Sequence, residues 1–159
     1  MSPGICAILS LADEKTSLPR FLILLASRIL LVSAFLYSGA DKTIRWSAGE
    51  QEIAASGLPL VSLLHVVTVV IQLGAGLSVV FGLQARFGAL ALCLLLVPIT
   101  ALYHPFWLVT GPSLVTELNH FLLNLGLVGG LLMVVVYGAE SPRGSARLRS
   151  NEVRRRGNN

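Results

Sequence analysis

The chain has 159 residues, of which 54% are hydrophobic and only 13% are charged. Soluble domains carry about 25% charged residues, and a mean hydropathy of +0.76 is too high for a surface in water. These values exclude a soluble enzyme, a disordered chain and a nucleic-acid-binding module. The length fits one domain, and the class that remains is an all-α polytopic membrane protein.

Four apolar stretches follow one another along the chain. No charged residue occurs in 53–85, 87–116 or 118–139, and a further apolar stretch, 21–40, is interrupted only by Arg28. A bilayer core about 30 Å thick needs about 20 apolar residues in a helix, so each stretch can hold one span. We predict a bundle of four transmembrane helices over 20–40, 59–83, 86–104 and 117–137.

The segments outside the spans are two ends and three connections. Residues 1–19 are interpreted as a short amphipathic or disordered lead-in, because the apolar run within them is too short for a signal peptide. A loop over 41–58 and a turn at 84–86 join the first three helices. Pro105, Gly111 and Pro112 end the third helix. The membrane domain is therefore 20–140, followed by a basic disordered tail over 141–159.

Lysine and arginine are distributed unevenly between the two sides of this arrangement. One side holds Lys15, Arg20, Arg86 and six tail arginines, whereas the other holds Lys42 and Arg45. The positive-inside rule then places both termini in the cytoplasm. The arginine-rich tail either binds anionic lipid headgroups, at about 1 kcal/mol per residue, or serves only to set the topology. Nucleic-acid binding is not expected.

Polar side chains recur inside the spans at steps of three and four residues, so they share helix faces. Polar groups are costly toward lipid, and these faces are therefore expected to meet in the bundle interior. We predict an outward-facing ligand pocket lined by His65, His104, Trp107, Glu117, His120 and Asn124. Four of the six also have a simpler interpretation: a packed histidine at 65, an aromatic belt at 104 and 107, and helix–helix contact at 124.

A second interior feature is a polar contact between the first two spans. At 1.5 Å per residue, Arg28 and Gln72 lie about 12 and 16 Å from the cytoplasmic edge. We predict that they form a hydrogen bond; the alternative is that Arg28 extends toward cytoplasmic headgroups. Gly74, Gly76 and the Gly126-x-x-x-Gly130 spacing are interpreted as close packing sites. The sequence shows no C-x-x-C, metal-ligand, phosphate-loop or nucleophile motif, so we expect no catalytic residue and no metal.

Five blocks of this sequence resemble the DoxX family. They are Arg28-x-x-Leu31 with Phe35-Leu36-Tyr37-Ser38-Gly39 and Lys42; Gly57-Leu58-Pro59; Gln72-Leu73-Gly74-Ala75-Gly76-Leu77 with Phe81-Gly82-Leu83 and Arg86; His104-Pro105-Phe106-Trp107; and His120-Phe121-x-x-Asn124-Leu125-Gly126. The family usually has Glu at the position of Gln72 and often Lys at that of Leu123. Both departures remove charge from the interior.

The resemblance implies a four-helix protein of the bacterial cytoplasmic membrane. Family members are linked with redox processes, including a subunit of thiosulfate:quinone oxidoreductase, and more distant relatives are membrane chaperones or cargo receptors. We therefore expect an accessory subunit that docks a redox-enzyme partner or binds a quinone-like or lipid ligand, without catalysis of its own. The alternative is a small-molecule transporter or a membrane chaperone. Fold alone does not decide between them.

Overall fold

The computed structural model describes the backbone of residues 3–138 and the side chains of 18, 19 and 21–138. Every regular element in this part of the chain is helical, which confirms the all-α class. In order they are α1 (Pro3–Ile44), α2 (Trp46–Ala55), α3 (Val61–Val70), the π-helical turn η1 (Ile71–Ala75), α4 (Gly76–Phe81), α5 (Ala85–Tyr103), the 3-10 turn η2 (Phe106–Leu108) and α6 (Ser113–Tyr137). The predicted tail over 141–159 lies outside the described residues.

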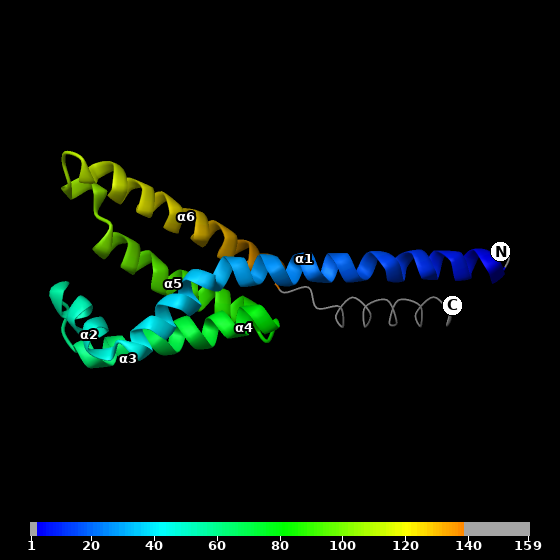
Figure 1. Cartoon of the computed structure of the whole chain (residues 1–159), viewed down its shortest axis with the longest axis horizontal. Coiled ribbons are helices and arrows are strands. Elements are labelled where there is room, and N and C mark those ends of the chain that lie inside the picture. The colour runs from blue at the N-terminus through cyan, green and yellow to red at the C-terminus, as the bar shows by residue number, and fades with distance from the viewer. Residues whose placement is uncertain (1–2, 139–159) are drawn as a thin grey trace.

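Four helical segments are long and apolar enough to cross a membrane, as the sequence predicts. They are Phe21–Ile44, Val61–Phe81, Ala85–Leu108 and Ser113–Tyr137. Figure 1 shows α2, η2 and the start of α6 at one end of the molecule, which we call the loop end. The turn between α4 and α5 and the last residues of α6 lie at the other end of the four-helix bundle, and α1 extends beyond them toward the N-terminus. We call this second end the tail end.

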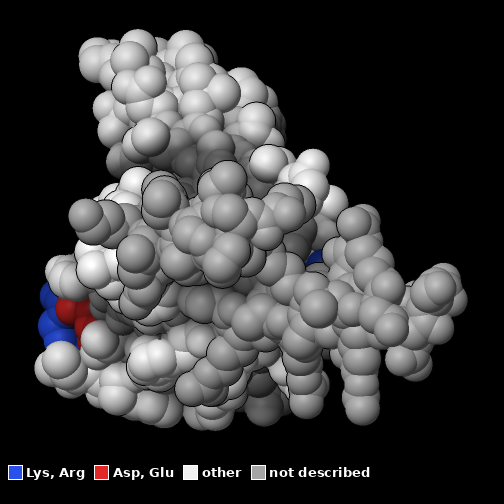
Figure 2. All heavy atoms as spheres, turned by 90° about the vertical axis from the view of Figure 1, so that its right-hand side faces the viewer, with Lys and Arg blue, Asp and Glu red and all other residues white. Residues whose placement is uncertain are grey.

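The outer surface of the helices is apolar, which suits a lipid environment. Leu30, Phe87 and Leu123 are 72%, 71% and 67% exposed. Seen from the tail end, the described surface shows charged side chains only in small groups (Figure 2). Large exposed apolar areas of this extent are rare on soluble monomers, so the described part of the chain is built to contact lipid.

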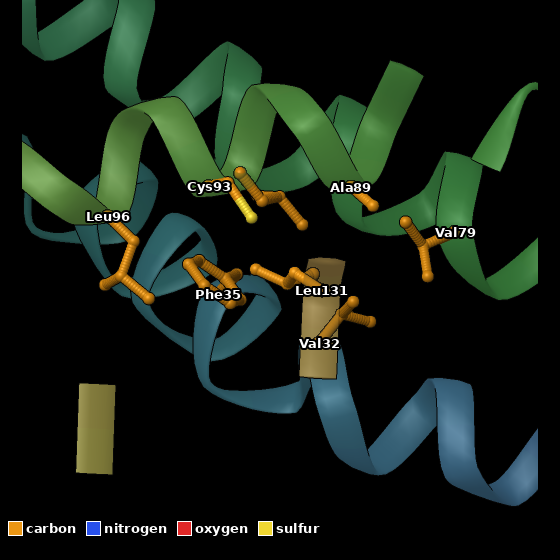
Figure 3. Packing of buried hydrophobic residues seen from close by; sticks show 8 residues of the cluster. Val32, Phe35, Val79, Ala89, Cys93, Leu96 and Leu131 are labelled. Atoms are coloured by element: carbon orange, nitrogen blue, oxygen red, sulfur yellow. The ribbon is translucent and has the colours of Figure 1, made fainter. Parts of the chain in front are cut away.

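The packed core lies where four helices approach one another. Val32 and Phe35 of α1, Val79 of α4 and Leu131 of α6 are buried against α5. On α5 the buried residues recur at steps of three and four and form one face, consisting of Ala89, Leu92, Cys93 and Leu96. Figure 3 shows these side chains pointing toward a common centre. This core fixes α5 in the middle of the bundle, and α6 packs mainly on α5.

The helix bounds differ from the predicted ones in three places. The helix α1 begins at Pro3 and continues to Ile44. Residues 3–19 are therefore helical, and the first residues of the predicted loop over 41–58 belong to α1. Its last turn is supported by the hydrogen bond of Thr43 Oγ1 to the Gly39 carbonyl, 2.8 Å. Most of that loop forms α2, and the last span begins at Ser113 rather than at 117.

Two of the four glycines predicted to allow close helix packing do so. A Cβ at Gly76 would lie 2.7 Å from Leu36, and one at Gly130 would lie 2.7 Å from Leu31. These two glycines let α4 and α6 approach α1, as predicted. The prediction is wrong for Gly74 and Gly126, because a Cβ there would meet nothing within 4 Å.

Candidate functional site

Three of the predicted pocket residues meet at the loop end, where α5 ends and α6 begins. His104 is the residue that follows α5, and Glu117 and His120 lie on one face of α6 because they are three residues apart. His104 Nδ1 lies 2.9 Å from Glu117 Oε2. The imidazole rings of His104 and His120 have centroids 4.9 Å apart. We call these three residues the histidine–glutamate cluster.

The turn between α5 and α6 brings the cluster together. The backbone N–H of His104 makes the final helical hydrogen bond, to the Thr100 carbonyl at 3.1 Å, and the following Pro105 has no N–H to continue the ladder. Gly111 has φ of +77°, a left-handed conformation that favours glycine. Pro112 then precedes the first residue of α6. The chain reverses within this short connection, so the end of α5 faces the start of α6.

Three aromatic rings adjoin the cluster. Phe106 and Phe121 have ring centroids 5.0 Å apart, and Trp107 lies 5.2 Å from Phe106 and 6.0 Å from Phe121. All three contacts are edge-to-face, an arrangement that aromatic pairs favour. Trp107 remains 54% exposed. We call these three residues the aromatic group; it joins η2 to α6 immediately beside His120.

The cluster is partly shielded from solvent. The side chains of His104 and Glu117 are 26% and 27% exposed, while His120 is exposed. A carboxylate only accepts hydrogen bonds, so the His104 Nδ1–H donates to Glu117. Partial burial strengthens such a charge-assisted contact. Asn124 lies one turn beyond His120 on α6 and is half-buried.

His65 lies elsewhere and does not join the cluster. It is fully buried, its Nε2 donates to the Lys42 carbonyl at 3.2 Å, and its ring lies 4.3 Å from that of Trp46. Gly49 of α2 packs directly against the ring, where a Cβ would lie 2.8 Å from Nδ1. In Figure 1, α2 and α3 occupy a different corner of the loop end from the start of α6. The helix α2, which lies within the predicted loop over 41–58, covers His65.

The predicted hydrogen bond between Arg28 and Gln72 is not made. Gln72 Nε2 donates instead to Ser38 Oγ at 3.3 Å, and its buried Oε1 accepts no hydrogen bond from the described residues. Ser38 is ten residues beyond Arg28 on α1, about 15 Å along the helix axis. Gly39 has no side chain, which lets Gln72 approach this later part of α1. Gln72 is therefore held nearer the loop end than its depth estimate predicts.

Two other carboxylates near the loop end are held by cations. Arg45 Nε donates to Asp41 at 2.8 Å, and Lys42 Nζ lies 2.7 Å from Glu52 Oε2. The hydrogen bond that Arg45 donates to the Asp41 carboxylate, followed by the negative charge of that carboxylate, raises the pKa of Arg45 above its usual value. The first pair lies where α1 meets α2, and the second joins the end of α1 to a later turn of α2. Glu117 differs from both carboxylates because its partner is a histidine.

The three cluster residues are all among the pocket residues predicted from the sequence, but the metal-ligand set that they form together was not predicted. One potential metal-ligand atom from each of His104, Glu117 and His120 lies within 4.8 Å of the other two. The signal was present as Glu117-x-x-His120 on a helix, a spacing that directs both side chains to the same side. His104 lies thirteen residues before Glu117, and only the turn between α5 and α6 brings it close.

Comparison with known proteins settles the family. Residues 23–105, just over half of the chain, match the DoxX family. The chain belongs to the DoxX family. It is 25% identical over 119 residues to the protein named "Inner membrane protein YphA" of Escherichia coli (strain K12), which covers 75% of this chain and 85% of that protein. No solved structure matches the chain.

Family membership and four apolar helices together make the chain a multi-pass integral membrane protein. The family match ends at residue 105. It therefore includes His104 but neither Glu117 nor His120, and the cluster combines one residue of the matched segment with two beyond it. Family membership does not determine what the cluster does.

Proposed function

We propose that this chain is an accessory, partner-docking subunit of a membrane redox process, and that its loop end binds a quinone-like molecule. The observation that carries the proposal is the His104–Glu117 hydrogen bond, 2.9 Å long, with the His120 ring beside it. The DoxX membership supports the redox setting. The name of the Escherichia coli relative supports an inner-membrane location for this chain as well.

The chemistry of the cluster suits a quinone. A quinone is a flat, apolar ring with two carbonyl oxygens, and an imidazole N–H donates to such an oxygen. Histidine also changes its charge near neutral pH, so it exchanges protons with a reduced quinol. Pockets for such ligands combine apolar and aromatic walls with a few polar groups. At the loop end these are the aromatic group and the histidine–glutamate cluster.

The orientation is part of the same proposal. Nine lysines and arginines fall on the tail side and two on the loop side, when Arg28 within the first span is left aside. This asymmetry favours cytoplasmic termini. The cluster then opens at the outer surface of the cytoplasmic membrane, where a quinone can enter from the adjoining lipid.

Tryptophan fluorescence tests quinone binding, because the chain has two tryptophans and one belongs to the aromatic group. The Trp46→Phe variant leaves Trp107 as the single reporter. Titration with a short-chain ubiquinone in detergent should give saturable quenching on top of the linear quenching expected from micelle partition. His120→Ala in the same background should remove the saturable part, and Glu50→Gln, a carboxylate on α2, should retain it.

Purely linear quenching in the Trp46→Phe variant would contradict the quinone proposal. So would saturable quenching that His120→Ala leaves unchanged. A lipid that competes with the quinone and binds more tightly would assign the site to a lipid instead. Such competition is measured by repeating the titration with added anionic phospholipid.

A further inference from the structure

We propose that His104, Glu117 and His120 bind a single divalent transition-metal ion of the zinc type. Each residue offers one ligand atom, and the three atoms lie within 4.8 Å of one another. The residues come from two helices and are joined by a short turn, so the site is built by the fold and not by one sequence motif. No other group of three such residues is found among the described side chains.

The ligand types select the class of metal. Imidazole nitrogen suits zinc, copper, nickel and iron, whereas calcium and magnesium require sites rich in oxygen. Two histidines with one glutamate form the protein ligand set of several catalytic zinc sites. The same set, two histidines and a carboxylate, holds iron(II) in non-haem oxygenases. Zinc is the redox-inactive member of this group and the one we assign first.

The ligand atoms already lie near the spacing that the ion needs. With zinc–nitrogen and zinc–oxygen distances of about 2.0–2.1 Å, tetrahedral ligand atoms lie about 3.3 Å apart. His104 Nδ1 and Glu117 Oε2 are 2.9 Å apart, and Nδ1 is free to bind the ion in the tautomer whose proton is on Nε2. His120 is exposed and lies three residues from Glu117, so a change of side-chain rotamer can bring its nitrogen closer.

Three protein ligands leave one tetrahedral position for another molecule. Structural zinc sites are closed by four protein ligands, whereas sites that exchange ligands have three and keep the fourth position open. The cluster is of the second kind, and the exposure of His120 gives its open position access to the loop-end surface. We therefore expect the fourth ligand to be water or another small oxygen donor.

The metal site uses the same side chains as the proposed quinone site, but metal binding needs no quinone. The two proposals are tested with different probes, and either can fail alone. A metal titration is carried out on protein without added quinone. The quinone titration described above is carried out in the presence of a chelator.

Cobalt(II) is the probe, because it adopts the geometry of zinc and absorbs visible light when bound. The full chain, purified in detergent without a histidine tag and stripped with a chelator, is titrated with Co²⁺ at pH 7.5. We expect one equivalent to give a saturable band that Zn²⁺ abolishes. His120→Ala and Glu117→Gln should each weaken Co²⁺ binding by at least about 100-fold, more than the typical effect of residues around metal ligands.

Glu50→Gln is the matched control, because it removes a loop-end carboxylate that does not belong to the cluster. It should bind one Co²⁺ like the wild type, and far-UV circular dichroism should show equal helix content in all variants. Absence of a saturable band in the wild type would overturn the proposal. Stoichiometric binding that survives both cluster variants would overturn it too. If His120→Ala lowers the helix content, the result for Glu117→Gln is used instead, because this substitution keeps the shape of the side chain. Loss of Co²⁺ binding in Glu117→Gln then supports the site, and retained binding overturns it.

Discussion

Replacing Gly49 with alanine should destabilise the protein through a single contact with His65. The added methyl group would lie 2.8 Å from His65 Nδ1 and would overlap Cε1, whereas ordinary contacts are 3.4–4 Å. The ring cannot retreat easily, because it is fully buried and its Nε2 is bonded to the Lys42 carbonyl. Either the ring or the whole of α2 must therefore move.

Three contributions determine the change in the free energy of unfolding, two of them destabilising and one stabilising. Overpacking costs about 1–3 kcal/mol, and loss of the His65 hydrogen bond costs about 1 kcal/mol. Alanine in place of glycine within a helix returns up to about 1 kcal/mol. We expect a net loss of about 1–3 kcal/mol in the free energy of unfolding, measured by titrating detergent-solubilised protein with SDS and following the circular dichroism of the helices.

Gly129→Ala is the matched control, because Gly129 also lies in a helix but a Cβ there would meet nothing within 4 Å. This variant should be as stable as the wild type or up to about 1 kcal/mol more stable. A double-mutant cycle adds specificity: in a His65→Ala background, Gly49→Ala should lose its effect. Equal stability of Gly49→Ala and Gly129→Ala would refute the packing of α2 on His65.

Three further predictions concern the bundle. Leu131→Ala should cost about 1–2 kcal/mol, because Leu131 is fully buried and leaves a cavity, while exposed Leu123→Ala should cost less; the lipid environment removes most of the transfer contribution. Gln72→Leu should change the free energy of unfolding by less than about 1 kcal/mol, because hydrogen bonds in membranes average about 0.6 kcal/mol; a loss above 2 kcal/mol would show that Gln72 has a stronger partner than Ser38. Reporter fusions at Gln84 and after Arg149 should report cytoplasm and fusions within 108–112 the outer side; the reverse pattern would move the cluster to the cytoplasmic face.

The spans could be predicted because their signal is local. An apolar stretch of membrane length with few or no charges forms a helix in lipid whatever it packs against, so the four spans needed no tertiary information. The helix α2 was missed because its ten residues are neither apolar nor periodic enough to stand out. It is held in place by tertiary contacts, such as the Lys42–Glu52 ion pair and the packing of Gly49 on His65.

The candidate site could be predicted only in part, for the same reason. Glu117 and His120 share a face of one helix, which their spacing determines. Whether His104 or His65 joins them depends on how the helices turn and pack. The Pro105–Pro112 connection brings His104 in, while α2 holds His65 in another corner of the loop end. The estimate of depth likewise predicted the wrong partner for Gln72, because depth along a helix does not specify which neighbour a side chain faces.

The most direct test of the loop end as a ligand site is native mass spectrometry of protein extracted with its own lipids. Wild type, His120→Ala and Glu50→Gln are purified in parallel, and the mass added to each folded chain is measured. We predict that wild type and Glu50→Gln retain the same small molecule or metal ion, and that its occupancy in His120→Ala falls at least about tenfold, the lower end of what lost metal-site contacts cost. Equal occupancy in all three proteins, or no added mass on the wild type, would contradict the assignment of the histidine–glutamate cluster as a binding site.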